Sequence, residues 1–396
     1  MDLRASGRVL YVSAADVSVG NGPGVNENEF VHALHAALGE RAHFLVPRPS
    51  ESVDDLPRAA LHFCHPHRRY HPLHFPRHVL SQIRAANRLL AGRRFDLLVF
   101  RIDVFPLVPL YLTWKHRLPY AIKTLGTGGL NALEHRGWLA RALAPLNRWM
   151  FRRLVGGSLA ADTDSVLHAE ELRERLGQGE EKIVWIDNAV NTVRFAPRSP
   201  EEARQALGLE GFEPVVGYVG SRPWERGGAQ LVEAAARLVP AYPNLGVVVV
   251  GAGGPVAELE QRAAALGIAE RCRFPGYVPY RQIPHYVRSL DLGVSLSLRP
   301  ERQMNSELKV RQYLAAGKPI VISPGSNEFV VEQGFGSVVP PEDIRAIADA
   351  IGAWLAKPAA ERNAFAAKAA AYMHENLSMA AAIARRLRLW GERMPA

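Results

Sequence analysis

The chain has 396 residues, of which 48% are hydrophobic and 22% are charged, a balance that indicates a globular protein and excludes a disordered one. A chain of this length suits two domains of roughly 150–200 residues each. The net charge is +9, but residues 65–155 alone carry sixteen Lys or Arg against three acidic residues. Such a basic block predicts an anionic partner, and the candidates are lipid headgroups, a diphosphate-linked acceptor and nucleic acid.

Cysteine usage and the N-terminal residues predict a cytoplasmic protein. Cys64 and Cys272 lie far apart and cannot form a disulfide framework, so a reducing compartment fits them. The segment MDLRASGRVLYVS lacks the apolar stretch and cleavage site of a secretory signal. No run approaches the roughly 18 apolar residues of a membrane-spanning helix. We therefore expect a cytoplasmic location, with peripheral attachment to the inner membrane face considered for the basic block.

Short apolar segments alternate with helical patterns along almost the whole chain, in two runs. The predicted strands of the first run are RVLYVS (8–13), AHFLVP (42–47), FDLLVF (95–100), YAIKTL (120–125), SLAAD (158–162) and KIVWID (182–187). Those of the second run are PVVGYVG (214–220), LGVVVVG (245–251), CRFPG (272–276), LGVSLS (292–297), KPIVIS (318–323) and GSVVP (336–340). Segments such as EFVHALHAAL between them have helical periodicity. This alternation predicts an α/β protein with parallel sheets covered on both faces.

The two runs predict two doubly wound, Rossmann-like domains. A polar connection, RFAPRSPEEARQALGLEGFEP, separates them and indicates a boundary near residues 197–210. We assign residues 1–197 to an N-terminal domain and residues 198–377 to a C-terminal domain. The last helix, about residues 378–396, is expected to pack back on the N-terminal domain.

Glycines and cations follow several predicted strands, at the sheet edge where ligands of doubly wound domains bind. Glycines let the backbone approach a ligand, and helix N-termini offer unpaired N–H groups to anions. The residues that follow the strands are Gly20, Gly22, Gly24, Arg101, Asp103, Gly126 to Gly129, Asn188, Asn191, and Ser221 to Gly228; Lys309 lies beyond the fourth strand of the second run. Together they predict a diphosphate site in which cationic side chains take the place of a metal.

Each signal also has a plainer interpretation. The glycines at 20–24 lack the spacing of the dinucleotide fingerprint and could form a simple turn. Arg222, Arg226 and Lys309 could be solvated surface residues. Six histidines lie between His62 and His78, but Pro72 and Pro76 argue against a helix there, so a basic surface loop is favoured over a zinc site.

The segment GWLARALAPLNRWMFRRLV, residues 137–155, combines tryptophans, leucines and arginines at helical spacing. A basic, amphipathic helix flanked by tryptophan is typical of proteins that lie on membrane surfaces. The alternative is a helix whose apolar face packs on the core while its arginines point to water. The sequence leaves both interpretations open.

Six segments along the chain resemble those of a known family. VVGYVGSRPWERGGAQLVEA resembles the strand, phosphate loop and helix of the donor-binding half of GT-B glycosyltransferases of family 4, which are retaining, nucleotide-sugar-dependent enzymes. VVVVGAGG, RCRFPGYVPYRQIPHYVRSLDLGVSLS and QYLAAGKPIVIS follow in the family's order. IDNAVNTVRFAP and LYVSAADVSVGNGPGVNENEF are similar to its domain-closing segment and its N-terminal glycine loop. The resemblance covers nearly the whole chain and implies two Rossmann-like domains facing across a cleft.

The resemblance also implies roles for individual residues. Arg226 and Lys309, helped by Arg222, would neutralise the charge that grows on the leaving diphosphate. The implied donor-binding residues are Gly22, Gly24, Ser221, Tyr277, Val278, Ser306, Glu307, Leu308 and Gln312. The implied acceptor-side residues are Arg101, Asp103, Lys123, Gly126 and Thr127. No metal and no cofactor is expected, because the nucleotide sugar is the substrate and the cations act on its diphosphate.

The chain departs from the family at several positions. The family's basic pair falls on Ser221 and Arg226, so one position lacks its arginine, and Arg222 is the candidate to replace it. The family's two glutamates fall on Met304 and Gln312, and an amide binds ribose hydroxyls more weakly than a carboxylate does. The family's cleft histidine falls near Leu125, close to Lys123 and Thr127; Lys309, three residues before Gln312, also occurs in family variants.

The function that the resemblance implies is a hexosyltransferase-type glycosyltransferase. It would move a sugar from a nucleotide-diphosphate sugar to a glycan or lipid-linked acceptor, with retention, in bacterial polysaccharide or glycolipid assembly. The basic region 65–155 would face an anionic membrane, and no nucleic acid is expected because no stacking platform of aromatic residues is present. Two rivals remain, a catalytically impaired GT-B scaffold and a nucleotide-sugar epimerase or hydrolase. The latter would need proton-transfer groups such as Glu27, Glu29, Asp103 or Glu307.

Overall fold

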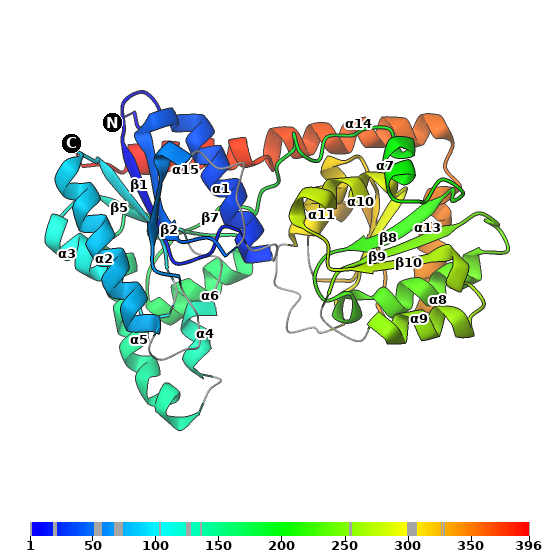
Figure 1. Cartoon of the computed structure of the whole chain (residues 1–396), viewed down its shortest axis with the longest axis horizontal. Coiled ribbons are helices and arrows are strands. Elements are labelled where there is room, and N and C mark those ends of the chain that lie inside the picture. The colour runs from blue at the N-terminus through cyan, green and yellow to red at the C-terminus, as the bar shows by residue number, and fades with distance from the viewer. Residues whose placement is uncertain are drawn as a thin grey trace. The chain divides into compact units, whose positions relative to one another are not determined.

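The computed structural model describes residues 2–18, 22–50, 58–66, 74–102, 104–123, 128–134, 137–252, 256–298, 307–325, 327 and 329–395. The chain forms two compact units (Figure 1). The first consists of residues 1–188 and 379–396, and the second of residues 189–378. Each unit is a parallel sheet with helices on both faces, as the alternation of strands and helices predicted.

The first unit is built on a seven-stranded sheet of order β3-β2-β1-β4-β5-β6-β7, with every described pairing parallel. Its strands are β1 (Val9–Ser13), β2 (Ala42–Pro47), β3 (Leu61–Cys64), β4 (Leu97–Arg101), β5 (Tyr120–Lys123), β6 (Ala161–Thr163) and β7 (Ile183–Trp185). Its α-helices are α1 (Gly22–Leu38), α2 (His74–Gly92), α3 (Leu107–His116), α4 (Gly128–Glu134), α5 (Trp138–Gly157), α6 (Val166–Leu176) and α15 (Met379–Glu392). The order reverses between β1 and β4, which makes that edge the switch point.

The edge strand β3 and the helix α2 correct the sequence interpretation of residues 62–78. β3 was not predicted, because its four residues, LHFC, contain no Val or Ile run and are too few to show an alternating pattern. His62 lies in this strand and His78 in α2, so the expected surface loop is wrong for both. α2 begins at His74, which places Pro76 in its first turn, where proline is tolerated. His67 and His71 lie outside the described residues.

Different helices cover the two faces of the first sheet. On one face α1 and α15 pack through Phe30, Leu34, Ile383, Leu387 and Trp390, all fully or almost fully buried. On the other face α2 and α3 pack on β1, β2 and β4, while α4, α5 and α6 pack around β5, β6 and β7. The strands β1 and β2 are buried along their whole length, as near-continuous apolar strands of a doubly covered sheet should be.

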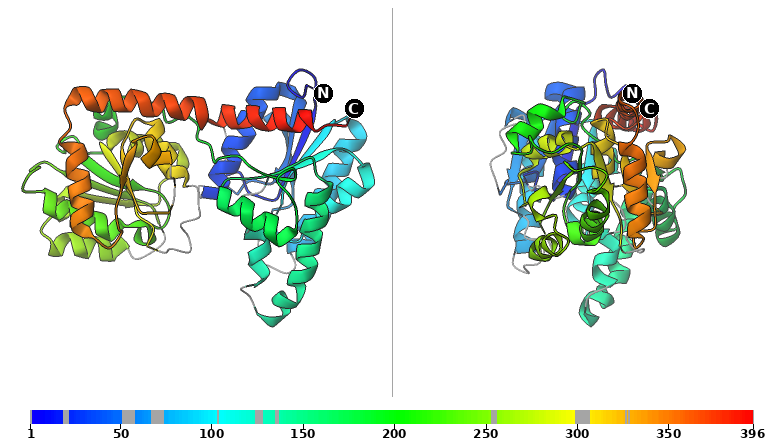
Figure 2. Two further views of the ribbon diagram at one scale, coloured as in Figure 1. Left: turned by 180° about the vertical axis from the view of Figure 1, so that it is seen from behind. Right: turned by 90° about the vertical axis from the view of Figure 1, so that its right-hand side faces the viewer.

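The second unit has a six-stranded parallel sheet of order β10-β9-β8-β11-β12-β13, which reverses between β8 and β11. Its strands are β8 (Val215–Val219), β9 (Gly246–Val250), β10 (Cys272–Gly276), β11 (Leu292–Ser295), β12 (Ile320–Ile322) and β13 (Gly336–Val338). Its α-helices are α7 (Pro200–Ala206), α8 (Gly228–Leu238), α9 (Val256–Ala265), α10 (Ile283–Ser289), α11 (Leu308–Ala315), α12 (Phe329–Glu332), α13 (Ile344–Leu355) and α14 (Ala359–Asn376). Helices α8, α9 and α13 cover one face, and α10, α11 and α14 the other (Figure 2).

The second unit begins at Ala189, nine residues before the predicted boundary at 197/198. The reason is that Val190 and Phe195 are buried in the core between the sheet and α11 and α14. Val190 also forms a parallel bridge with Ser378, where the chain leaves the unit. The polar residues 197–210, which suggested the boundary, instead lie within the second unit and include α7. No helix among the described residues is long and apolar enough to cross a membrane.

Candidate functional site

The switch point of the second unit carries a cluster of charged residues. Arg226 ends a short 3-10 helix (Pro223–Arg226) after β8, Ser295 ends β11, and Glu307 stands immediately before α11. The Glu307 carboxylate accepts a hydrogen bond from Arg226 and another from the Ser295 hydroxyl at 2.6 Å. The Lys309 ammonium lies 3.4 Å from the same carboxylate and 5.2 Å from the centre of the Tyr218 ring. Two cations therefore meet one carboxylate at the sheet edge where anions bind.

Burial and charge act against each other on these groups. Burial on its own raises the pKa of Glu307, but the charges of Lys309 and Arg226 outweigh it and hold the pKa below its ordinary value. Burial lowers the pKa of Lys309 and the Arg226 charge adds to this, although Glu307 opposes it. A carboxylate held ionised does not suit general acid catalysis at neutral pH. The arrangement instead holds the Arg226 and Lys309 side chains in fixed positions. Two positive charges face one negative charge, so the cluster has a net charge of +1.

Two glycines let this cluster form. A Cβ atom at Gly220 would lie 2.7 Å from Cε of Lys309, so a side chain there would displace the lysine. Gly227 has a φ of +84° and lies immediately before α8 as its N-cap, and a Cβ there would lie 2.7 Å from Cβ of Leu296. Both the backbone angle and the close approach require glycine at this turn.

The other predicted donor residues occupy different positions around this edge. Arg222 pairs with Glu225 at 3.3 Å and is exposed, so it does not join Arg226 and Lys309 on Glu307. Ser221 is exposed, and its carbonyl accepts a hydrogen bond of 2.6 Å from the Tyr218 hydroxyl. After β10, Tyr277 is exposed and Val278 is buried; Leu308 is half-buried and Gln312 is buried in α11. Ser306 lies outside the described residues.

The switch point of the first unit carries a second buried charge cluster. Glu27 of α1 is fully buried and accepts hydrogen bonds from Tyr11 of β1 and Arg101 at the end of β4. Lys123, the last residue of β5, lies 3.7 Å from the Glu27 carboxylate. Its ammonium also donates to the Asn26 side chain at 2.9 Å and lies 4.1 Å from the centre of the Phe30 ring. The predicted residues Arg101 and Lys123 are thus brought together on one carboxylate.

Asn26 extends this cluster to the end of the unit. Its amide nitrogen donates to the side-chain oxygen of Asn188 at 2.5 Å, and Asn188 is the last residue before the second unit. Next to Lys123 in the sheet, Asp162 of β6 pairs with Arg386 of α15 at 2.7 Å. The α15 helix is therefore held to the sheet by an ion pair as well as by its apolar face.

Lys123 makes the stability of the chain depend on pH. Burial lowers the pKa of Lys123 to about 8 from 10.5, although Glu27 opposes the shift. Between pH 8 and pH 10.5 the Lys123 ammonium keeps its proton in the unfolded chain but loses it in the folded chain. The free energy of unfolding should therefore rise as the pH rises from 8, and should fall again when the pH is lowered. We expect the melting temperature to rise from pH 8 to pH 9.5, by less in Lys123→Met than in the wild type. The exposed Lys368→Met serves as the control, and an equal rise in all three proteins would contradict this assignment.

The glycine loop and the remaining acceptor-side residues are described only in part. Gly22 and Gly24 lie in the first turn of α1, so the helix begins within the segment that the sequence predicted as a glycine loop, and the loop interpretation is wrong for these two residues. Asp103, Gly126 and Thr127 lie outside the described residues, as do Gly20 and Leu125. In the part of the chain that the structure describes, no group of three His, Cys, Asp or Glu side chains could hold a metal ion.

Sequence reasoning missed three contributors to these clusters, namely Ser295, Tyr11 and Asn26. Ser295 is a polar residue at the end of a buried strand, a pattern that could have identified it. Tyr11 lies within an apolar strand and gave no signal. Glu27 had been considered only as a proton-transfer group. Burial raises its pKa, but Arg101 and Lys123 lower it further, so the net shift is downward and does not suit a general acid.

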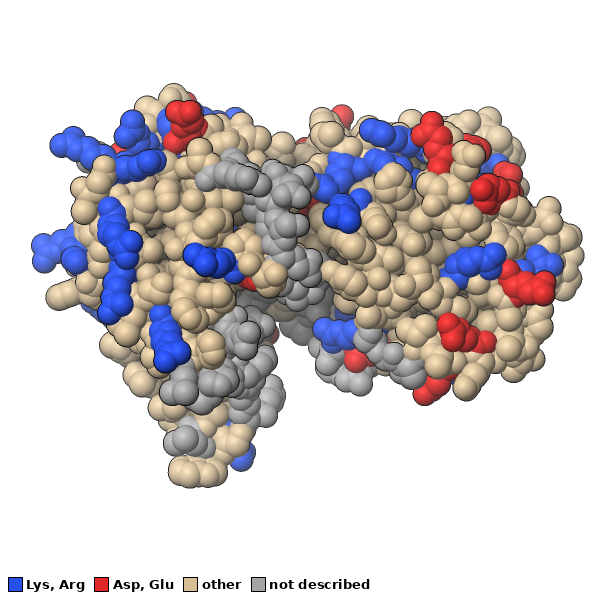
Figure 3. Space-filling model, viewed as in Figure 1, with Lys and Arg blue, Asp and Glu red and all other residues tan. Residues whose placement is uncertain are grey.

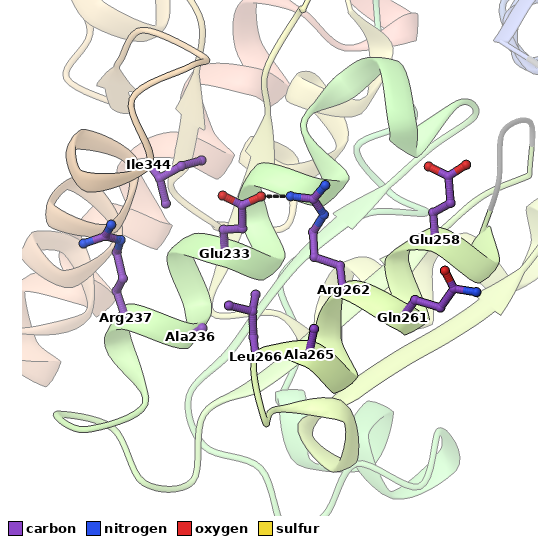
Figure 4. Close-up of a pocket in the computed structure, with 9 residues that line it drawn as sticks. All are labelled: Glu233, Ala236, Arg237, Glu258, Gln261, Arg262, Ala265, Leu266 and Ile344. Carbon is purple, nitrogen blue, oxygen red and sulfur yellow. Dashed lines mark hydrogen bonds and ion pairs between the residues drawn. The ribbon is translucent and has the colours of Figure 1, made fainter.

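A surface hollow on the second unit lies away from these strand ends. It is formed by α8, α9 and the first residue of α13, and an ion pair between Glu233 and Arg262 crosses it (Figure 4). Its lining residues are Glu233, Ala236, Arg237, Glu258, Gln261, Arg262, Ala265, Leu266 and Ile344. None of the predicted site residues belongs to it, and we assign it no role in the chemistry.

Comparisons with known proteins agree with this geometry. Residues 199–372 match the model of the family described as glycosyl transferases group 1. The lipopolysaccharide core biosynthesis mannosyltransferase LpsB of Rhizobium meliloti is 32% identical over 178 residues, which are 42% of this chain and 49% of that protein. The 2-deoxystreptamine glucosyltransferase of Streptomyces kanamyceticus is 34% identical over 193 residues, 46% of this chain and 48% of that protein. The chain thus spans about half the length of these relatives.

The whole chain can be compared through its fold. The crystal structure of Anabaena HepE in complex with UDP has a TM-score of 0.71 and 17% identity, and the match covers 97% of this chain and all of that one. Two parallel-sheet units, each with its own switch point, agree with that likeness. The predicted fold class is confirmed at this level. Residues 199–372, less than half of the chain, therefore resemble the glycosyl transferases group 1 family, and the chain as a whole has the GT-B fold, with two Rossmann-like units.

Proposed function

We propose that this chain is a hexosyltransferase-type glycosyltransferase that moves a sugar from a nucleotide-diphosphate sugar to a hydroxyl of a glycan or lipid-linked acceptor. The observation that carries the proposal is the cluster of Arg226, Glu307 and Lys309 at the switch point of the second unit. That unit also contains the segment that matches the family. The name of one relative, a lipopolysaccharide core biosynthesis mannosyltransferase, supports bacterial polysaccharide or glycolipid assembly as the pathway in which the chain acts.

In the proposed reaction the bond between the anomeric carbon and the diphosphate oxygen breaks, and the acceptor oxygen bonds to the same face of the sugar. Retention of configuration would follow, and the acceptor's proton would leave with the diphosphate. Arg226 and Lys309 would stabilise the negative charge that develops on the diphosphate, because Glu307 already holds both cations in place. Their positive charge is the electrostatic help that a metal ion would otherwise supply, so we propose a reaction that needs no metal and no cofactor.

A buried Gln312 in place of the family's ribose-binding glutamate supports one alternative, a GT-B scaffold with weakened donor binding. An epimerase or hydrolase is less well supported, because the pKa values of Glu27 and Glu307 are both lowered on balance: the neighbouring cations outweigh burial, which on its own raises them. A carboxyl group that donates a proton at neutral pH needs a raised pKa, and a base is more effective when its pKa lies near the working pH.

Nucleotide binding is the first test of the proposal. We expect one of UDP, GDP, ADP, CMP and dTDP to raise the melting temperature, with UDP first because HepE was crystallised with it. A ligand at a hundred times its dissociation constant stabilises by about 2.7 kcal/mol, which corresponds to roughly 5–10 °C for a domain of this size. Arg226→Ala should reduce the shift, whereas Arg237→Ala, in the hollow between α8 and α9, should leave it unchanged. No shift with any nucleotide would favour the scaffold, and Gln312→Glu would then be the next variant to measure.

A further inference from the structure

The helix α5 is divided between the protein core and the surface. In its C-terminal half, Phe151, Leu154 and Val155 are buried against β5, β6 and α6. The side chain of Asn147, also buried, marks the transition: it accepts a hydrogen bond from the backbone of Phe105 and donates one to the carbonyl of Gly129. Before Asn147 the helix is largely exposed, and Figure 1 draws α4 and α5 projecting from the rest of the first unit. The core-facing interpretation of this helix therefore holds only for its second half.

The exposed half presents large apolar side chains to the outside. Trp138, Ala142, Leu146 and Trp149 are spaced four, four and three residues apart, so they lie along one side of the helix. Trp138 is 76% exposed and Trp149 is 58% exposed. Two tryptophans and a leucine along one helix face form an apolar stripe that the first unit does not cover. We call these four residues the α5 stripe.

The charged residues of α5 itself all have one sign. The helix contains four arginines and no acidic residue. Arg141, Arg152 and Arg153 are exposed and form no ion pair with the described residues, while Arg148 pairs with Glu134 at 3.0 Å. Figure 3 shows that Lys and Arg also predominate over Asp and Glu on the face of the first unit that is turned to the viewer. An apolar stripe flanked by arginines that no described acidic residue neutralises fits a surface that offers both hydrocarbon and negative charge.

We propose that the α5 stripe and its arginines dock on a membrane that contains anionic phospholipid. The tryptophan rings and Leu146 would enter the boundary between headgroups and acyl chains, where amphipathic aromatic side chains are favoured. Arg141, Arg152 and Arg153 would bind lipid phosphates, because a guanidinium pairs with two phosphate oxygens. A lipid surface suits a projecting helix, since lipids rearrange around it and no complementary groove is needed. The inference goes beyond the proposed transferase activity and does not depend on it.

The test is co-sedimentation of the full chain with vesicles of phosphatidylcholine, with and without phosphatidylglycerol. We expect binding only to the anionic vesicles, with loss at high salt, because exposed charges are screened. Trp138→Ala and Trp149→Ala should each lower the partition coefficient roughly tenfold, and Arg141→Gln and Arg152→Gln roughly fivefold each. Brominated lipid should quench the tryptophan fluorescence of Trp138→Phe less than that of the wild type. Such a decrease would place the Trp138 ring of the wild type in the bilayer.

Two matched controls come from other faces of the same unit. Trp114→Ala removes a tryptophan on α3 that is 75% exposed, and Arg388→Gln removes an exposed arginine on α15. Both should bind vesicles like the wild type. The proposal is overturned if the wild type does not bind anionic vesicles at low salt, or if the α5 variants and the controls lose binding equally. Thermal shifts with UDP on the same variants report the donor site separately, so failure of the docking surface and failure of the proposed function are distinguishable.

Discussion

Replacing Arg226 with alanine is expected to lower kcat/KM for sugar transfer by roughly 10²–10³, the loss seen when one preorganised donor to a developing negative charge is removed. The side chain already pairs with Glu307, which fixes its direction before substrate binds. Without it, Glu307 still keeps Lys309 and Ser295 as partners, so the variant should fold normally. The measurement is steady-state kinetics with the nucleotide sugar that the thermal-shift panel identifies.

Two further variants separate charge from geometry at this position. Arg226→Lys keeps the charge but not the planar fork, and should recover only part of the activity. Arg222→Ala removes an exposed arginine that pairs with Glu225, so its effect should stay below about tenfold because exposed pairs are weak. Equal rates for the wild type and Arg226→Ala would rule out the role assigned to Arg226. A loss in Arg222→Ala as large as in Arg226→Ala would move the phosphate contact to Arg222.

Removal of the Glu27 carboxylate should have the largest effect on stability. In Glu27→Ala, the cations of Arg101 and Lys123 remain close together without their shared counter-charge. Loss of one partner from a buried ion pair typically costs about 3–5 kcal/mol of the free energy of unfolding. The measurement is a urea unfolding curve monitored by circular dichroism. The urea concentrations at the midpoints are compared between the variant and the wild type, provided that the dependence of the free energy on urea is the same for both.

Glu134→Ala provides the matched control in the same unit. Glu134 also pairs with two arginines, Arg148 and Arg175, but these side chains are partly exposed to water. Pairs of that kind contribute about 1 kcal/mol or less. If Glu27→Ala costs no more than Glu134→Ala, the buried cluster does not stabilise the first unit in the way described here.

The sequence predicted the fold well where a local pattern carried the information. Near-continuous apolar strands followed by helices indicated two parallel sheets, and polar residues after β4 and β5 indicated one edge, where Arg101 and Lys123 do meet. β3 was missed because an edge strand of four residues has no periodicity of its own. The boundary was placed too late because polarity marked residues 197–210, which include α7, while Val190 and Phe195 were assigned to the first domain although they pack in the core of the second unit.

The site was less predictable because the residues that contact one another there lie far apart in the sequence and meet only in the folded chain. Nothing near Glu27 in the sequence shows that its counter-charges stand at the ends of two other strands. Similarly, Arg222 and Arg226 looked equivalent in the sequence, yet only Arg226 reaches Glu307. For α5, the sequence suggested a single apolar set from Trp138 to Leu154, but the structure divides it: Leu154 is buried whereas Trp138 is exposed. Which part is covered depends on where the helix leaves the sheet.

The return of α15 to the first sheet has a consequence for biosynthesis. Ile383, Leu387 and Trp390 complete a core that the first 188 residues begin, and Arg386 pairs with Asp162. On the ribosome the second unit has all of its strands and helices before α15 emerges. At about 5–20 residues per second, synthesis of the second unit takes roughly 10–40 s, during which the face of α1 that α15 will cover stays open. The unit that is translated first is thus the one that finishes folding last, and chaperones that shield nascent apolar surface would meet it in that interval.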